Sequence, residues 1–381
     1  MLVRKVFPAM NKRLFSAPGR VEIGGNHTDH QHGRVLASAI DLEATCSAVP
    51  NGTSIVNITN KQYGNINIDL SDLSIHDDEK DTPAALVRGV AAWFTKNGFK
   101  TGGFDGVVAS NIPVGSGLSS SAAFEVLIGN VFKGLFGADV SPLDIAIAGR
   151  FAENVYFGKP CGLMDQAASS FGGLSMIDFE NPEHTIVTPI DADLSGYALC
   201  VVATGGDHAD LTPDYAAIPD EMKSVASHFG KGYLREVEPN DFYAAIGSMK
   251  HLSKRAILRA VHFYDDHERV LKQADALKRG EIQTFLDLVN ESGRSSLAYL
   301  QNVFSPSDPH NQELTLALAL SEKILAGKGA WRVHGGGFAG TILAFVPDNL
   351  KEVYRKQMSE VFGENTCLFL NVRVDGGMEV T

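Results

Sequence analysis

The chain has 381 residues, and 45 acidic residues outnumber 33 basic ones, which gives a net charge of −12. This negative charge argues against a nucleic-acid-binding protein, because the phosphate backbone requires a positive surface. Hydrophobic residues make up 44% of the chain and charged residues 20%, which argues against disorder. At this length one hydrophobic core usually gives way to more than one, so we expect two domains.

The cysteines indicate the compartment. Cys46, Cys161, Cys200 and Cys367 lie far apart and form no CxxC pair, a distribution typical of reduced thiols in a cytoplasmic protein. The N-terminal segment MLVRKVFPAMNKRLF lacks the apolar run of a secretory signal. No stretch approaches the roughly 20 apolar residues that span a membrane. We therefore expect a cytoplasmic protein that is not bound to membranes.

The first half of the chain mixes strand and helix patterns. Residues 14–75 contain short stretches rich in β-branched residues, such as TSIVNITN at 53–60. Beyond them the pattern predicts, in chain order, a helix from Thr82–Pro83 to Asn97–Gly98, a strand at 104–110, a helix after the Gly/Ser segment at 113–123, and a helix from Ser141–Pro142 to about residue 155.

The second half begins with a predicted strand at 197–204 and continues with charged helical segments at about 240–278, 281–292 and 310–326. Strand-like and glycine-rich segments alternate from there to the end. The stretch 178–196 has few large apolar residues, so we place the domain boundary within it. The expected domains are residues 1–180 and 181–381.

The 38 glycines concentrate in three clusters. The first is APGRVEIGGNHTDHQHG at 17–33, the second is PVGSGLSSSAA at 113–123, and the third is VHGGGFAGT at 333–341. We expect each cluster to form a loop. For the third, which lies between two strand-like segments, a tight structural turn and a close backbone approach to an active site both remain open.

The second cluster has the features of a phosphate-binding loop. Glycine permits a tight turn, and an apolar-periodic helix follows the serines, so free backbone N–H groups and the positive helix end surround one concavity. A serine hydroxyl also suits Mg²⁺. No Walker A motif occurs, so backbone amides, Mg²⁺ and Arg20 would have to balance the phosphate charge. The alternative is a Gly/Ser linker with a serine helix cap.

The first cluster is dense in hydrogen-bonding side chains. Arg20, Glu22, His27, Asp29, His30 and His32 fall within thirteen residues, a density that suits a sugar ligand. The same histidines and aspartate are residue types that zinc accepts, although their spacing matches no common zinc motif. A zinc site and a plain polar surface loop therefore remain as alternatives.

Together, in this order and spacing, the clusters resemble the GHMP small-molecule kinases, and within them the bacterial galactokinase family. The PGR-V segment with G-x-H-T-D, the P-x-G-x-G-L-S-S-S-A-A loop and the C-terminal glycine motif all match, as does ENVYFGKPCGLMDQ at 153–166. The resemblance runs from about residue 14 to the C-terminus. It implies an α+β fold with an N-terminal ribosomal-protein-like domain, a C-terminal ferredoxin-like domain and an active site in the cleft between them.

The resemblance also implies residue roles. Asp165 would take the proton of the anomeric hydroxyl as O1 attacks ATP, and Arg20 beside it would hold the carboxylate ionised. The sugar would be bound by Asn26, His27, Asp29, Gly162 and Tyr215. ATP would be bound by Gly115, Ser116, Gly117, Leu118, Ser119, Ser120 and Ser121, and Mg²⁺ by Ser121 and Glu153.

Each of three assignments keeps a plain structural alternative. Asp165 precedes Ala-Ala-Ser-Ser and suits a helix cap, while Glu153 suits an exposed surface. Tyr215 suits an ordinary half-buried position, because the YAAIP stretch lacks the Asn and Arg that usually follow the family tyrosine.

The sequence departs from the family signature G-E-H-T-D-Y at Asn26 and His30, which replace Glu and Tyr. Asparagine still hydrogen-bonds a hydroxyl, but it also tolerates a carboxylate at C6 of the sugar. We therefore expect galactose as substrate, with galacturonate or another hexose as the alternative. A sugar- and ATP-binding regulator and a metal-dependent hydrolase are the rival classes. The expected partners are a sugar and ATP, and we expect a monomer.

Overall fold

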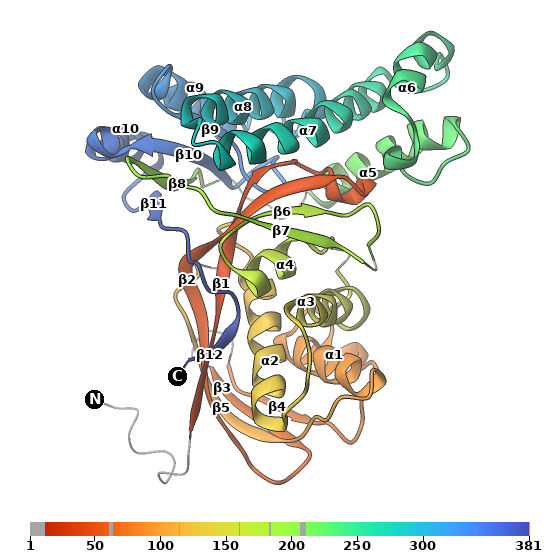
Figure 1. The fold of residues 1–381 in the computed structure, drawn as a ribbon, viewed down its shortest axis with the longest axis vertical. Helices are drawn as coiled ribbons and strands as arrows, with labels where there is room; N and C mark the ends of the chain where they lie inside the picture. Colours follow the sequence, from red (N-terminus) through yellow and green to blue (C-terminus); the bar gives the residue numbers. More distant parts are fainter. Residues whose placement is uncertain are drawn as a thin grey trace.

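A computed structural model of the chain describes residues 12–60, 64–113, 115–159, 161–182, 184–205 and 211–380. Across these residues the strands form one sheet of eight strands and one of four. Figure 1 shows helices α1–α4 beside the first sheet, in the lower part of the view, and the second sheet with helices α7–α10 in the upper part. The molecule thus has the two α/β parts that the sequence predicts.

The first sheet is built on two long neighbouring strands, β1 (Arg13–Gly24) and β2 (Arg34–Pro50). One half of β2 pairs with β6 and the other half pairs with β5, so this strand joins two parts of the sheet. The short strand β12, from the end of the chain, pairs with β1. The other strands of this sheet are β3 (Ile55–Asn60), β4 (Ile66–Asp69), β5 (Phe104–Ser110), β6 (Leu174–Asp178), β7 (Ile186–Ile190) and β12 (Met378–Val380).

Four helices accompany the first sheet: α1 (Pro83–Lys96), α2 (Ser120–Phe136), α3 (Pro142–Phe151) and α4 (Met164–Phe171). Helix α2 is central, because its apolar residues pack against β1 and β2 in the largest core cluster. Ser141 begins α3 with a capping box to Asp144. The chain then continues as a π-helical turn over Ala152–Phe157, a local distortion that is frequent at functional sites.

The second sheet is antiparallel, with the order β11-β8-β10-β9. This order, with helices after its first and third strands, is the ferredoxin-like pattern that the resemblance implied. The strands are β8 (Tyr197–Ala203), β9 (Ala330–Val333), β10 (Thr341–Pro347) and β11 (Cys367–Leu370), and the helices are α5 (Thr212–His228), α6 (Pro239–Ala245), α7 (Lys254–Lys278), α8 (Ile282–Ser295), α9 (Glu313–Leu325) and α10 (Lys351–Phe362).

Both faces of this sheet are covered, because successive residues of a strand point to opposite sides. Cys200 and Val202 of β8 belong to the core that includes Tyr354 of α10. The alternate residues Leu199 and Val201 belong instead to the large core, which also takes in α8 and the first sheet. A continuous apolar core therefore connects the two parts of the molecule.

Most of the predicted elements are confirmed, including the strands at 53–60, 104–110 and 197–204. The expectation of short strands near the N-terminus was wrong for β1 and β2, since Gly19 and Gly24 lie inside a strand that bulges rather than ends there. The helix expected over 240–278 is two helices, because Ser253 caps a new start at Lys254. Helices α5 and α10 were not predicted.

The domain division at residue 180 stays a prediction. Strand β7 follows that residue and β12 lies near the end of the chain, yet both belong to the first sheet.

Of the helices in the described part of the chain, none is long and apolar enough to cross a membrane.

Candidate active site

The site is centred on an ion pair between Arg20 and Asp165. Nε of Arg20, on β1, lies 2.8 Å from Oδ1 of Asp165, in the first turn of α4. The other oxygen, Oδ2, accepts a hydrogen bond of 2.6 Å from Oγ of Ser119. Asp165 therefore connects β1, α4 and the loop before α2. These contacts argue against the plain helix-cap reading of this carboxylate.

The surroundings of Asp165 favour its ionised form. Burial alone would raise the pKa of this carboxyl group, but the charge of Arg20 and the hydrogen bonds from Arg20 and Ser119 outweigh burial and lower the pKa. Its side chain keeps 34% exposure, whereas that of Arg20 keeps only 6%. Asp165 is thus a negatively charged and accessible carboxylate that is held by the buried guanidinium group of Arg20.

The predicted phosphate loop has the backbone of a tight turn. Gly115 and Gly117 have φ of 73° and 71°, and Ser119 has φ of 57°, all in the left-handed region. Helix α2 begins at the next residue, Ser120. Nη1 of Arg20 donates to the carbonyl of Gly117 at 2.6 Å, and the Arg20 amide donates to Leu118 at 3.2 Å. Val114 lies outside the described residues.

These bonds distinguish the loop from a linker. The alternative of a serine cap also fails for Ser119, because its hydroxyl is bonded to Asp165 and makes no cap hydrogen bond to α2. Ser116 closes the turn itself, with its hydroxyl donating to the carbonyl of Pro113 at 2.6 Å.

The third glycine cluster forms the turn between β9 and β10 and lies against the other two clusters. A Cβ atom placed on Gly117 would come within 3.0 Å of Oγ1 of Thr341 and 3.4 Å of Nδ1 of His334. Nε2 of His27 donates to the carbonyl of Gly336 at 2.9 Å. The three clusters therefore meet, and residues 333–341 are more than a connection between strands.

The first cluster is part strand and part turn, which corrects the expectation of a loop over 17–33. Residues 17–24 belong to β1, and only the residues after Gly24 leave the sheet. His27 has a positive φ of 58°, and burial lowers the pKa of its ring to about 3, so it is neutral. Because Nε2 donates to Gly336, Nδ1 is an acceptor, and this buried atom has no hydrogen-bond partner.

Asp29 and Gly162 lie against each other. A Cβ atom on Gly162 would clash with Oδ2 of Asp29, so a larger residue there would displace this carboxylate. His30, which replaces the signature tyrosine, has its ring centroid 5.5 Å from that of His27. The predicted sugar-binding residues of the first cluster and of the 153–166 segment thus share one location; Pro160 of that segment is not described.

Tyr215 of α5 reaches the same glycine turn. Its hydroxyl donates to the carbonyl of Gly337 at 2.8 Å, and its ring packs edge-on against Phe338 with centroids 5.3 Å apart. Burial raises the pKa of this phenol to about 12. Tyr215 therefore supports the turn, beyond the ordinary half-buried role that the sequence left open.

Asn26 was predicted to bind the sugar, but its side chain is enclosed by protein. Its side chain is 0% exposed, and its four hydrogen-bonding positions are all occupied by protein atoms. One of its partners, Glu22, also forms a buried ion pair of 2.9 Å with Arg332, so Asn26, Glu22 and Arg332 form a hydrogen-bonded chain. No free polar atom of Asn26 remains for a substrate in this arrangement.

The predicted metal residues lie together beside this centre. Oγ of Ser121 lies 3.5 Å from Oε1 of Glu153, which is 4% exposed rather than on the surface. Beneath them Nε2 of Gln166 donates at 2.9 Å to both Glu153 and Glu125. Burial is the main cause of a raised pKa of Glu153. It raises the pKa of Glu125 by a larger amount.

This donor set fits Mg²⁺ rather than zinc. A hydroxyl and a carboxylate are hard oxygen donors, and Mg²⁺ commonly uses one or two carboxylates together with substrate phosphates. One oxygen of Glu125 and one of Gln166 are also buried without a partner. In the described part of the chain, no group of three or more His, Cys, Asp or Glu side chains is arranged to hold a metal.

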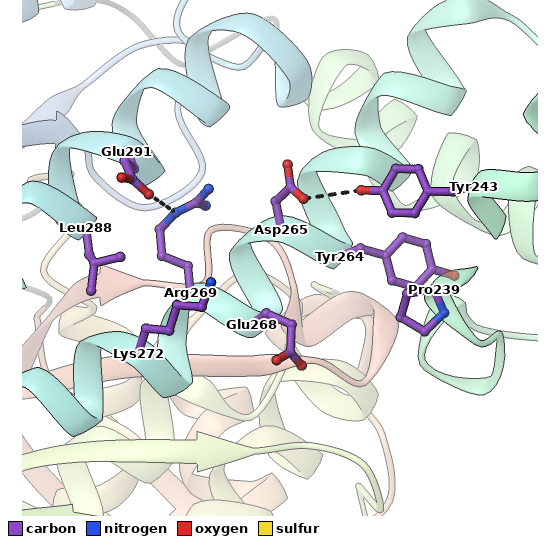
Figure 2. Close-up of a pocket in the computed structure, with 9 residues that line it drawn as sticks. All are labelled: Pro239, Tyr243, Tyr264, Asp265, Glu268, Arg269, Lys272, Leu288 and Glu291. Carbon is purple, nitrogen blue, oxygen red and sulfur yellow. Dashed lines mark hydrogen bonds and ion pairs between the residues drawn. The ribbon is translucent and has the colours of Figure 1, made fainter. Parts of the chain in front are cut away.

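A surface hollow lies elsewhere, among α6, α7 and α8. Figure 2 shows Tyr243 paired with Asp265 and Arg269 paired with Glu291 along its walls. None of the predicted site residues lines it. The candidate active site is therefore defined by the contacts above and not by this hollow.

No role in the site was predicted for four residues that surround Asn26. Glu22 and Arg332 hold the buried ion pair, and Ser296 and Asn302 bond Asn26 from the far side. Arg332 gave one detectable signal, a charged residue within the short apolar strand that precedes the glycine motif. Ser296 and Asn302 gave none, because they approach Asn26 from about 270 residues away in the sequence.

Comparisons with known proteins identify the class first. Residues 85–173 match the model of the GHMP kinases N terminal domain, and residues 4–50 match the galactokinase galactose-binding signature. The fold is similar to that of the Lactococcus lactis galactokinase complexed with galactose, with a TM-score of 0.85 at 24% identity over 97% of this chain and 95% of the other. Methanococcus jannaschii mevalonate kinase is more distant, with a TM-score of 0.68 at 14% identity over 96% and 99% of the two chains.

Sequence comparison then identifies the family. The chain is 31% identical to the galactokinase of Glaesserella parasuis over 94% of its own length and 92% of the relative. It is 30% identical to the galactokinase of Mannheimia succiniciproducens over 92% of its own length and 89% of the relative. The chain belongs to the galactokinase family of GHMP kinases. It is thus a phosphotransferase of a kinase family that uses ATP as co-substrate.

Proposed function

We propose that the protein phosphorylates D-galactose at its anomeric O1, using ATP and releasing galactose 1-phosphate and ADP. The observation that carries the proposal is the Arg20–Asp165–Ser119 contact, because it joins an ionised carboxylate directly to the predicted phosphate loop. The names of the sequence relatives support galactose as the sugar. The monomeric, cytoplasmic state expected from the sequence is part of the proposal.

In the proposed mechanism, Asp165 accepts the proton of the O1 hydroxyl. O1 then bonds the γ-phosphorus while the bond from that phosphorus to the β,γ-bridging oxygen breaks and ADP leaves. Arg20 keeps Asp165 ionised and balances charge on the transferring group. The chain contributes mainly positioning and electrostatic stabilisation, as is general for phosphoryl transfer.

ATP is proposed to bind at residues 115–121, with its phosphates on the backbone amides of the turn and at the start of α2. Ser121 and Glu153 would hold Mg²⁺, which when bound neutralises phosphate charge. The sugar is proposed to contact His27, Asp29, the backbone of Gly162 and the surface next to Tyr215. The neutral His27, with its acceptor Nδ1, suits a sugar hydroxyl and disfavours a carboxylate.

A coupled ADP-release assay tests this proposal with galactose, galacturonate, N-acetylgalactosamine and glucose as acceptors. Galactose is expected to be turned over with the highest kcat/KM. Turnover of galacturonate without galactose would overturn the substrate assignment. ATP and galactose binding without ADP release from any of the sugars would instead indicate the regulator.

A further inference from the structure

The environment of Asn26 points to a role other than sugar binding. An asparagine side chain has two N–H donors and an oxygen with two acceptor positions. All of these are occupied here, and the backbone amide and carbonyl of the residue are bonded as well. Nδ2 donates to Oε1 of Glu22 at 2.9 Å and to the carbonyl of Gly335 at 2.7 Å. Oδ1 accepts from Ser296 at 3.2 Å and from Asn302 at 2.8 Å. The backbone amide donates to Asp266 at 3.0 Å, and the backbone carbonyl accepts from His262 at 2.9 Å.

The partners come from separate parts of the chain. Glu22 lies on β1, Gly335 lies in the glycine turn, and Ser296 and Asn302 follow α8. Asn26 therefore fixes the turn that carries His27 and Asp29 against the glycine turn of the second sheet. His27 reinforces the same junction through its bond to Gly336.

The charge at this junction is held by Glu22. Its carboxylate is 3% exposed, and its Oε1 accepts both from Nδ2 of Asn26 and from Nη2 of Arg332, each at 2.9 Å. A carboxylate at position 26 would place two acceptors against each other beside one arginine, and breaking a buried pairing of this kind is costly. Whenever Glu22 is ionised, which its raised pKa of about 7 confines to higher pH, it thus requires a neutral donor at position 26.

We propose that Asn26 is a positioning residue that makes no contact with the sugar, and that its amide couples the sugar-binding turn to the glycine turn through the buried Glu22–Arg332 pair. The proposal deepens the proposed function, on which its substrate readout rests. Asn26 therefore gives no reason to expect that the protein accepts a sugar acid. Sugar preference is carried by the neighbours that Asn26 orients.

The test is a double-mutant cycle at pH 8, where Glu22 is ionised, with the near-isosteric changes N26D and E22Q. N26D turns the donor facing Glu22 and Gly335 into an acceptor, so the melting temperature is expected to fall by about 5 °C. E22Q restores a donor opposite Asp at position 26, so E22Q/N26D should recover at least half of that loss. N130D is the matched control, since Asn130 is buried but donates to the carbonyl of Val126, and E22Q should not rescue it.

Kinetics separate positioning from a purely structural role. N26D is expected to raise the KM for galactose about tenfold and to leave the KM for ATP unchanged. The ratio of galactose to galacturonate turnover should stay within about threefold of wild type. E22Q should again restore the KM for galactose. If N26D does not fold, S296A, which removes one bond to Oδ1, should raise the galactose KM about threefold, and an unchanged KM would contradict the proposal.

A stable N26D variant, an absence of rescue by E22Q, or a shift of preference toward sugar acids in N26D would each overturn it. The thermal cycle does not depend on catalysis. If the wild-type protein released no ADP from galactose while the cycle showed rescue, the proposed function would fail and the positioning role would stand.

Discussion

Oγ of Ser119 donates a hydrogen bond of 2.6 Å to Oδ2 of Asp165. This bond joins the loop predicted to hold the ATP phosphates to the carboxylate predicted to deprotonate the sugar. Because Arg20 binds the other oxygen of Asp165 and the carbonyl of Gly117, the base and the loop are fixed to each other from two sides.

The first prediction concerns Asp165. Asp165→Asn removes the proton acceptor, so kcat is expected to fall about 10³-fold while ATP binding, measured by calorimetry, stays within about threefold. Asp178→Asn is the matched control, because it breaks another partly buried Arg–Asp contact, with Arg34 at 2.6 Å, outside the site. The control should lose stability and keep kcat. Near-normal kcat in the Asp165 variant would remove its assigned role.

The second prediction separates the serines of the loop. Ser119→Ala removes the bond to Asp165 and should lower kcat about tenfold with little change in the KM for ATP, because the base loses one of its orienting contacts. Ser120→Ala leaves that bond in place, so its effect should fall on the KM for ATP. Equal effects of the two variants on kcat would argue that Ser119 acts only on phosphate.

The third prediction concerns the glycine turn. A Cβ atom on Gly336 would lie 2.5 Å from Cε1 of Tyr215, so Gly336→Ala must displace the tyrosine or the turn. The KM for galactose is expected to rise about tenfold, with a lower melting temperature in thermal unfolding. Gly247→Ala is the control, since a Cβ atom there meets nothing within 4 Å. A Gly336 variant indistinguishable from this control would contradict the packing of Tyr215 on the turn.

The fourth prediction concerns pH. Burial raises the pKa of Glu22 to about 7, with Arg332 opposing the shift, whereas the group has a value of 4.5 when unperturbed. Between these values the folded protein holds a proton that the unfolded chain has released. The contribution of Glu22 to the free energy of unfolding therefore falls as pH rises through this window, by up to about 1.4 kcal/mol per pH unit.

Buried histidines such as His27 act in the opposite direction, because their pKa values are lowered. The difference between wild type and E22Q isolates the Glu22 contribution. The destabilisation that ionisation of Glu22 causes is small near pH 5 and close to its full size near pH 8, so E22Q should gain stability relative to wild type across this range. Urea unfolding at both pH values measures this change, and a constant difference would contradict the assigned environment of Glu22.

The sequence predicted local features well. Gly115 and Gly117 have the positive φ that a tight phosphate loop requires, and α2 begins directly after the loop as the apolar period indicated. The ferredoxin-like strand order followed only from the family resemblance, since strand pairing over long sequence distances leaves no periodic signal.

The enclosure of Asn26 could not be predicted. The identity of a residue within a signature indicates neither its burial nor its partners, and here the partners lie up to 309 residues away. The PGR segment was likewise expected in a loop, although it lies in β1, because the bulge that turns Arg20 toward Asp165 is a property of the paired strands.

Transfer of a phosphoryl group to O1 of galactose is tested most directly by ³¹P nuclear magnetic resonance of the product formed from ATP and galactose by the purified protein. We expect one sugar phosphate whose phosphorus is coupled to the anomeric proton, together with an equal amount of ADP. A product phosphorylated at another hydroxyl, or none from galactose while galacturonate is phosphorylated, would contradict it.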